Sequence, residues 1–178
     1  MDAYKKAKFR YYGLALFEIE IIYDTLSGLF EVSEEQLLTE DNGYISIVEI
    51  EFPVPFGEFF FQFFTMERWH KIKGIIKEMK RRRGKKGIKA YLGFYGISPE
   101  IKSHLIFLIV NGNNRQFEMG IEKIEYLVDI IPLHLKTLPA NIEEVTYYYD
   151  ETDYKWNPRS AKGESGLNYS FKNSSWKK

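Results

Sequence analysis

The sequence has no cysteine, which excludes disulfide bonds and thiolate metal sites. No apolar run approaches the roughly 20 residues that span a bilayer, so we expect no contact with a membrane. Residues 1–10 are rich in charge, unlike a signal peptide. These absences lead us to expect a cytoplasmic protein without cofactors.

Catalytic motifs are missing as well: there is no phosphate-binding GxxxxGK[ST], no HExxH and no GxSxG. His70, His104 and His134 are far apart in sequence, and we interpret them as ordinary surface or boundary residues. Residues 150–155, Asp-Glu-Thr-Asp-Tyr-Lys, pair acids with a lysine as metal-dependent nucleases do. A nuclease is nevertheless our least favoured hypothesis, and we expect a non-enzymatic protein with no catalytic residues or metal ligands.

Aromatic residues are abundant instead. Thirteen Tyr, 14 Phe and three Trp make up 17% of the 178 residues, more than the core of one domain of this size needs. We therefore expect some of these rings to contact a ligand rather than to pack inside the protein.

Charge is unevenly distributed, although the net charge is zero. Residues 67–89 hold eleven basic and two acidic residues, a local net charge of +9. A few cations at the end of a helix can be explained by its dipole, but eleven at helical spacing repel one another. We favour a polyanion as the ligand of this segment, with a solvated face or an acidic protein partner as alternatives.

The pattern of apolar residues predicts an α+β fold in the order βββ-α-ββ-α-β. We expect an antiparallel or mixed sheet of about six strands with two main helices. Thr65 is the predicted N-cap of a helix that ends at Arg83, and residues 113–116 begin a second helix that reaches Leu138. Residues 33–36 have capping-box spacing and could start a short additional helix. The predicted strands are residues 9–23, 44–52, 56–64, 88–97, 104–111 and 142–149.

Residues 1–149 form the predicted single domain. From residue 150 onward aliphatic residues almost vanish and Asn, Ser, Lys and Gly dominate, so we expect residues 150–178 to be a flexible polar and aromatic tail.

The predicted second helix carries an apolar heptad stripe between Phe117 and Leu138. The stripe can cover the sheet, or it can meet a second copy of the chain. Because Leu127 and Ile130 widen it, we expect a homodimer through this helix, with a kink at Pro132.

Two predicted strands combine cations with flat rings on one side. If Ile88, Ala90 and the alternate residues after them face inward, Lys89, Tyr91 and Tyr95 share the opposite side. This combination is typical of proteins that bind single strands, with cations on phosphates and rings on bases. We interpret the phenylalanine run at residues 59–64 as core. The candidate nucleic-acid-binding residues are Arg10, Tyr12, Arg68, Lys71, Arg81, Arg82, Arg83, Lys85, Lys86, Lys89, Tyr91 and Tyr95.

The helix start Thr-Met-Glu-Arg-Trp at 65–69 and the run Arg-Arg-Arg-Gly-Lys-Lys-Gly at 81–87 carry a resemblance to a known family. Residues 56–149 resemble archaeal ThermoDBP-type single-stranded nucleic-acid-binding proteins and, more loosely, Whirly-type proteins. The resemblance implies a dimer with a cleft in which residues 81–86 form a basic rim and Tyr91 and Tyr95 an aromatic floor. The basic, aromatic segment from Lys155 onward departs from the acidic tail of that family.

Our leading hypothesis is therefore sequence-tolerant binding of single-stranded DNA or RNA through a basic rim and aromatic stacking. The alternative is a protein-interaction module that docks an acidic partner.

Overall fold

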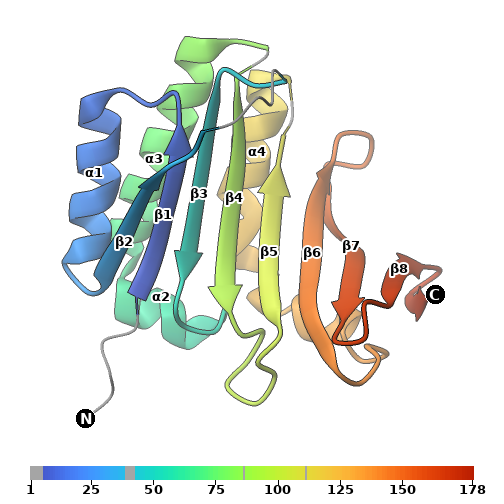
Figure 1. The fold of residues 1–178 in the computed structure, drawn as a ribbon. Coiled ribbons are helices and arrows are strands. Elements are labelled where there is room, and N and C mark those ends of the chain that lie inside the picture. The colour runs from blue at the N-terminus through green and yellow to red at the C-terminus, as the bar shows by residue number, and fades with distance from the viewer. Residues whose placement is uncertain (1–5, 39–42, 86, 111) are drawn as a thin grey trace.

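The computed structural model describes residues 6–38, 43–85, 87–110 and 112–178, and within them the chain forms one mixed sheet with helices packed on one side (Figure 1). The strands in these ranges are β1 (Lys6–Tyr12), β2 (Glu31–Gln36), β3 (Ser46–Phe52), β4 (Ile88–Tyr95), β5 (His104–Ile109), β6 (Ile142–Asp150), β7 (Lys155–Gly163), β8 (Asn168–Lys172) and β9 (Ser175–Lys177). The helices are α1 (Leu16–Ser27), α2 (Glu58–Phe64), α3 (Met66–Arg83), α4 (Asn114–Lys123), the 3-10 helix η1 (Ile124–Val128) and α5 (Ile131–His134).

The strand order is β2-β1-β3-β4-β5-β6-β7-β8-β9. Three pairs of neighbours, β1/β2, β3/β4 and β5/β6, are parallel, and helices connect the two strands of each pair. These connecting helices lie behind the sheet in Figure 1. The sheet therefore has one helix-covered face and one face that no helix of the described chain covers.

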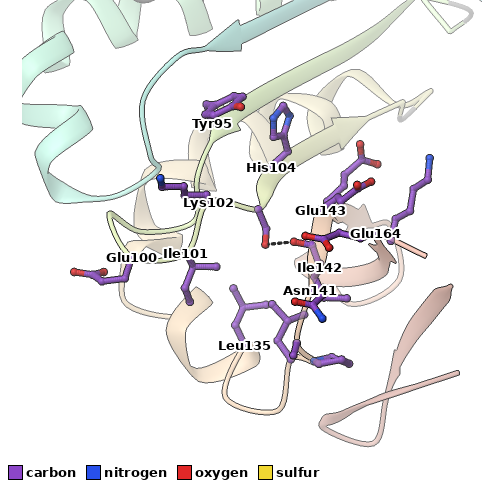
Figure 2. A pocket seen from close by; sticks show the side chains of 16 residues that line it. Tyr95, Glu100, Ile101, Lys102, His104, Leu135, Asn141, Ile142, Glu143 and Glu164 are labelled. Atoms are coloured by element: carbon purple, nitrogen blue, oxygen red, sulfur yellow. Dashed lines mark hydrogen bonds between the residues drawn. The ribbon is translucent and has the colours of Figure 1, made fainter. Parts of the chain in front are cut away.

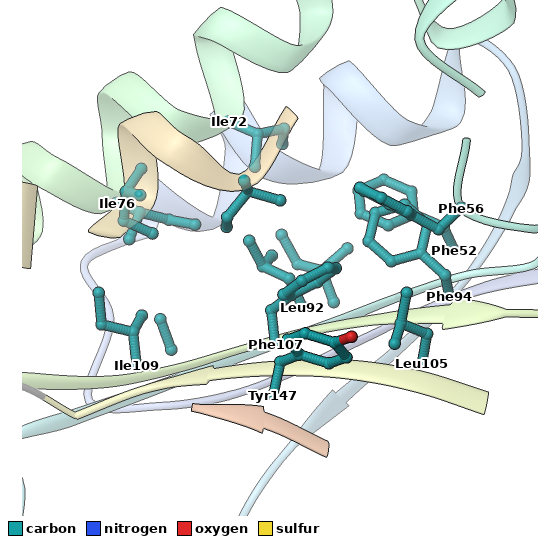
Figure 3. Close-up of a cluster of buried hydrophobic side chains, with 14 of the residues drawn as sticks. Phe52, Phe56, Ile72, Ile76, Leu92, Phe94, Leu105, Phe107, Ile109 and Tyr147 are labelled. Carbon is teal, nitrogen blue, oxygen red and sulfur yellow. The ribbon is translucent and has the colours of Figure 1, made fainter. Parts of the chain in front are cut away.

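The core lies between the sheet and the helices. Alternate side chains of the central strands, including Phe52, Phe94 and Phe107, meet Ile72 and Ile76 of α3 (Figure 3). Trp69 of α3 is fully buried among phenylalanine rings. Much of the aromatic surplus is therefore core packing. None of the described helices is both long and apolar enough to cross a membrane.

The predicted count of about six strands and two main helices is wrong: the described chain has nine strands and five α-helices. Residues 9–23 were expected as one strand, but β1 ends at Tyr12 and Gly13 turns the chain with a φ of 68°. Glu18 then accepts a hydrogen bond from the amide of Ala15 at 3.1 Å and so helps to start α1. The apparent period of two around Glu18 belongs to a helix.

Two other predicted elements have the opposite secondary structure. Residues 58–64, expected as strand, form α2, because Phe60 and Phe64 are four apart and both reach the core. A run of aromatic residues has no clear period, so its pattern could not distinguish helix from strand. Residues 33–36, which were expected to start a helix, lie in β2.

The segment expected to be a flexible tail forms β7, β8 and β9 of the sheet. Trp156 is buried and donates a hydrogen bond to the carbonyl of Gly120 at 2.8 Å. Trp176 is also buried, against Phe171. Aromatic rings here supply the buried area that the missing aliphatic side chains do not.

The helix caps are confirmed. The hydroxyl of Thr65 accepts from the amide of Arg68, and the side chain of Asn113 accepts from that of Gln116. The long second helix is wrong, however, because α4 passes into η1 and then α5, whose first turn holds Pro132.

The apolar heptad stripe covers the chain's own sheet, as the first of its two interpretations holds. Phe117, Ile121, Ile124 and Ile131 are all buried inside this one chain. These four side chains are thus not available to a second copy, whereas Ile130, which widens the stripe, is 40% exposed. The homodimer stays a prediction.

Candidate ligand-binding surface

The strand side chains that point away from the helices form a second surface, here called the open face. Inward and outward residues alternate along each strand, so neighbouring strands place their outward residues in rows. The open face of the central strands consists of Lys6, Lys8, Arg10 and Tyr12 of β1, Ile47, Glu49 and Glu51 of β3, Lys89, Tyr91, Gly93 and Tyr95 of β4, His104, Ile106 and Leu108 of β5, and Glu144, Thr146 and Tyr148 of β6.

One row crosses the middle of this face from Arg10 through Glu49 to Tyr91. The guanidinium of Arg10 lies 2.6 Å from a carboxylate oxygen of Glu49. Lys8 lies 3.7 Å from Glu51 in the next row. The acids of β3 thus neutralise the cations of β1, so the open face is a mixed polar surface rather than a basic one.

The ring of Tyr91 lies over Gly93. A methyl group at the Gly93 α-carbon would stand 3.0 Å from one ring carbon of Tyr91 and 3.5 Å from another. Because Gly93 has no side chain, the tyrosine ring can lean along the strand. Burial, followed by the carboxylates of Glu51 and Glu144, raises the pKa of Tyr91, so its hydroxyl stays neutral.

Tyr95 is the most accessible ring of β4, with 53% of its surface exposed. It meets the imidazole of His104 edge-on, with a centroid distance of 4.5 Å. The Nδ1 atom of His104 is 3.3 Å from Glu51. On the far side of the face, the guanidinium of Arg159 in β7 lies 4.8 Å from the ring of Tyr148. Cations and rings therefore both occur on this face between β1 and β7, with acidic and apolar side chains among them.

A pocket of about 720 Å³ adjoins the open face where β4 and β5 turn (Figure 2). Tyr95 and His104 lie at its upper end, and Leu135 and Ile142 supply apolar surface. The hydroxyl of Ser103 donates to the carbonyl of Ile142 at 2.5 Å and ties the β4–β5 turn to β6. The pocket is large enough for a small organic ligand.

The cations of α3 lie in the helix layer, on the other side of the sheet. Lys73 is buried and lies 2.9 Å from Glu122 and 2.6 Å from Glu125, and Lys77 also pairs with Glu122. Lys80 is fully buried and donates to the carbonyls of Gly84 and Gly112.

The arginines at the end of α3 also have partners within the chain. Arg81 lies 2.6 Å from Glu118, Arg82 lies 3.0 Å from Glu78, and Arg83 pairs with the buried Glu18. Four acids from other parts of the sequence, Glu18, Glu118, Glu122 and Glu125, thus match part of the local charge of +9. This segment holds helices together, which is a structural role that the sequence alone did not reveal.

The candidate residues of the sequence thus fall into two groups on opposite sides of the sheet. The structure brings together Arg10, Tyr12, Lys89, Tyr91 and Tyr95 on the open face. The second group lies in α3 and the turn after it, away from that face, and Lys86 lies outside the described residues. This second group comprises Arg68, Lys71, Arg81, Arg82, Arg83 and Lys85.

Sequence reasoning missed Glu49, Glu51, His104, Tyr148 and Arg159. Extending the alternation of inward and outward residues to each predicted strand would have placed the first four on a common side. The order of strands in the sheet cannot be deduced from that alternation. Arg159 was missed because its segment did not look like a strand.

The acidic segment between β6 and β7 stabilises a turn. A carboxylate oxygen of Asp150 accepts from the amide and the hydroxyl of Thr152, at 2.7 and 2.6 Å, which lowers the pKa of Asp150. Asp153 accepts from the amide of Lys155. Among the residues that the structure describes, no group of three or more acidic or histidine side chains could hold a metal ion.

Comparisons with protein-family models, with curated proteins and with solved structures each gave no match. The resemblance to ThermoDBP-type proteins therefore stays a prediction from sequence motifs.

Proposed function

We propose that this chain binds single-stranded DNA or RNA on the open face, with little sequence preference. The observation that carries the proposal is the pair of tyrosines on β4, Tyr91 lying over Gly93 and Tyr95 exposed beside it. Aromatic rings on open sheet faces stack bases in other single-strand binders, each stacked base being worth about 1–3 kcal/mol.

Cations on the same face supply phosphate contacts. Arg10 lies in the same row as Tyr91, with Glu49 of β3 between them, and Arg159 covers Tyr148. Since Glu49 already pairs with Arg10, a phosphate has to compete with a carboxylate. We therefore expect modest affinity with a shallow salt dependence, a slope of about −2 for roughly three phosphate contacts.

The shape of the face favours single strands over duplex. Duplex DNA is read mainly by elements that enter the major groove, such as a protruding helix. The open face presents strands with rings between them, and rings can stack only on bases that are already unpaired.

The test is fluorescence anisotropy with labelled oligo(dT), oligo(U) and a duplex, at about 50 and 200 mM salt, the range over which phosphate contacts weaken. Tyr95→Ala should weaken binding of both single strands about tenfold, the loss expected for one stacked base. Tyr126→Ala is the matched control, since Tyr126 on η1 is 72% exposed but lies in the helix layer.

Equal affinities of wild type, Tyr95→Ala and Tyr126→Ala would show that the open face does not bind the single strand. Tighter binding of the duplex than of either single strand would contradict stacking as its physical basis.

A further inference from the structure

Helix α1 carries large apolar side chains on its exposed side as well as on the side that packs against the protein. Its inward side buries a carboxylate and a hydroxyl, Glu18 and Thr25, beside Ile22 and Leu26. Its exposed side chains include four large apolar ones, Leu16, Phe17, Ile21 and Tyr23. A helix that is apolar nearly all round is normally buried all round.

α1 has room for a partner because it is the outermost helix of the layer (Figure 1). It lies behind β1 and β2, and β2 is the edge strand of the sheet. A second exposed apolar pair, Phe59 and Phe63 on α2, stands ring on ring beside Phe30, which follows α1. Apolar surface of this kind on several adjacent elements marks an interaction site.

Charge identifies the kind of partner. Between Arg10 and Arg68 the sequence contains no lysine or arginine but twelve acidic residues, although α3 brings the guanidinium of Arg82 to 5.0 Å from the ring of Phe17. On α1, Glu20 and Asp24 are exposed one turn apart between the apolar side chains, and neither forms an ion pair with any described residue. The neighbouring strand β2 adds the exposed acid Glu34, which is in register with the inward-facing Phe9 and accepts a hydrogen bond from the hydroxyl of Tyr11.

A second copy of this chain is a poor occupant of this surface. In a two-fold contact the same patch is used on both subunits, so a dimer with its axis at α1 would bring Glu20 and Asp24 of the two copies close together. Like charges brought together at an interface cost affinity.

We infer that α1, with the adjoining edge of β2, is a docking surface for a basic amphipathic helix of another protein. The partner's apolar residues cover Leu16, Phe17 and Ile21, and its lysines or arginines pair with Glu20 and Asp24. Amphipathic helices are recognised in this way by other proteins, through apolar anchors at helical spacing together with complementary charges. The surface is separate from the open face, so the inference does not depend on nucleic-acid binding.

The test uses a fluorescein-labelled synthetic helix of leucine and lysine with leucines at helical spacing. A peptide of the same composition in scrambled order and a leucine–glutamate counterpart serve as probes of specificity. Wild type should bind only the first peptide tightly. Glu20→Lys combined with Asp24→Lys, and separately Ile21→Ser, should each weaken that binding about tenfold, which corresponds to ~1.4 kcal/mol.

Matched controls change equal charge and equal apolar surface elsewhere: Asp129→Lys with Glu151→Lys, and Leu133→Ser, all at exposed positions. These should retain wild-type affinity. If Ile21→Ser fails to fold, Leu16→Ser tests the same surface. Leu16 is 71% exposed, so its replacement should leave the fold intact. Equal binding of the scrambled peptide, or equal losses in the controls, overturns the inference, as does a wild-type dimer in sedimentation that Ile21→Ser abolishes.

Discussion

The guanidinium of Arg83 donates to the two carboxylate oxygens of Glu18 at 2.9 and 2.6 Å, across 65 residues of sequence. Glu18 is almost completely buried, and the pair joins the first turn of α1 to the last turn of α3. An arginine that looks available for phosphate in the sequence is thus committed to a structural contact.

This pair leads to a stability prediction. Arg83→Ala leaves the Glu18 carboxylate buried without a partner and should cost about 3 kcal/mol of unfolding free energy. Arg82→Ala, which removes an exposed pair with Glu78, should cost less than about 1 kcal/mol. Urea unfolding followed by circular dichroism measures both, and equal effects would show that the buried pair is not structural.

Two helical glycines should respond in opposite directions to substitution by alanine. At Gly120 of α4 a methyl group would lie 2.5 Å from Cδ1 of Ile109, so Gly120→Ala should destabilise the fold by about 1–3 kcal/mol. At Gly74 of α3 nothing lies within 4 Å, and Gly74→Ala should stabilise it by about 0.5–1 kcal/mol. Thermal unfolding of the two variants tests the packing of α4, and a stabilised Gly120→Ala would contradict it.

Half-buried His134 predicts a pH dependence. Burial lowers the pKa of His134, whose Nδ1 lies 3.0 Å from the hydroxyl of Tyr147. Below pH ~6.5 the unfolded state takes up a proton that the folded state resists, so stability falls as the pH decreases through that value. His134→Gln should flatten this part of the curve in urea unfolding at several pH values, and an unchanged slope would show that this imidazole is not the source of the pH dependence.

Removing residues 151–178 should abolish cooperative unfolding, because it deletes β7, β8 and β9 together with two buried tryptophans. Trp156→Ala alone should cost about 3–5 kcal/mol. If the truncated chain melts like the full-length protein in calorimetry, β7, β8 and β9 do not contribute to the stability of the fold, and the sequence-based prediction of a flexible tail is supported.

Gly93→Ala tests the stacking platform without removing a ring. The added methyl group would push against Tyr91, so oligo(dT) affinity should fall while the fold stays intact. The control is Gly112→Ala, where the nearest atom is 3.5 Å away. Anisotropy measures both, and unchanged affinity of Gly93→Ala would show that the position of the Tyr91 ring is irrelevant to binding.

The sequence correctly predicts those features that depend on interactions between residues a few positions apart. Thr65 and Asn113 are caps in the sequence and in the structure. The outward side of β4, with Lys89, Tyr91 and Tyr95, followed from alternation alone. These positions depend on neighbours in sequence and need no knowledge of the fold.

Contacts between distant segments could not be predicted in this way. From the sequence the basic stretch is a candidate ligand site, because the acids that neutralise part of it lie far away along the chain: Glu18, Glu118, Glu122 and Glu125. Nor could the open face be assembled from the sequence, because it depends on which strands are neighbours. Glu49 and Glu51 of β3, for example, can be recognised as ion-pair partners only when β1 is known to be the neighbouring strand, because they pair with Arg10 and Lys8.

The most direct test of the proposed function is amide chemical-shift mapping of the ¹⁵N-labelled protein titrated with unlabelled oligo(dT). The account predicts that the largest shifts fall on Arg10, Tyr91 and Tyr95 of the open face, with little change along α3. Shifts concentrated on Arg81, Arg82 and Lys85, with β4 unaffected, would contradict it and return the site to the end of α3.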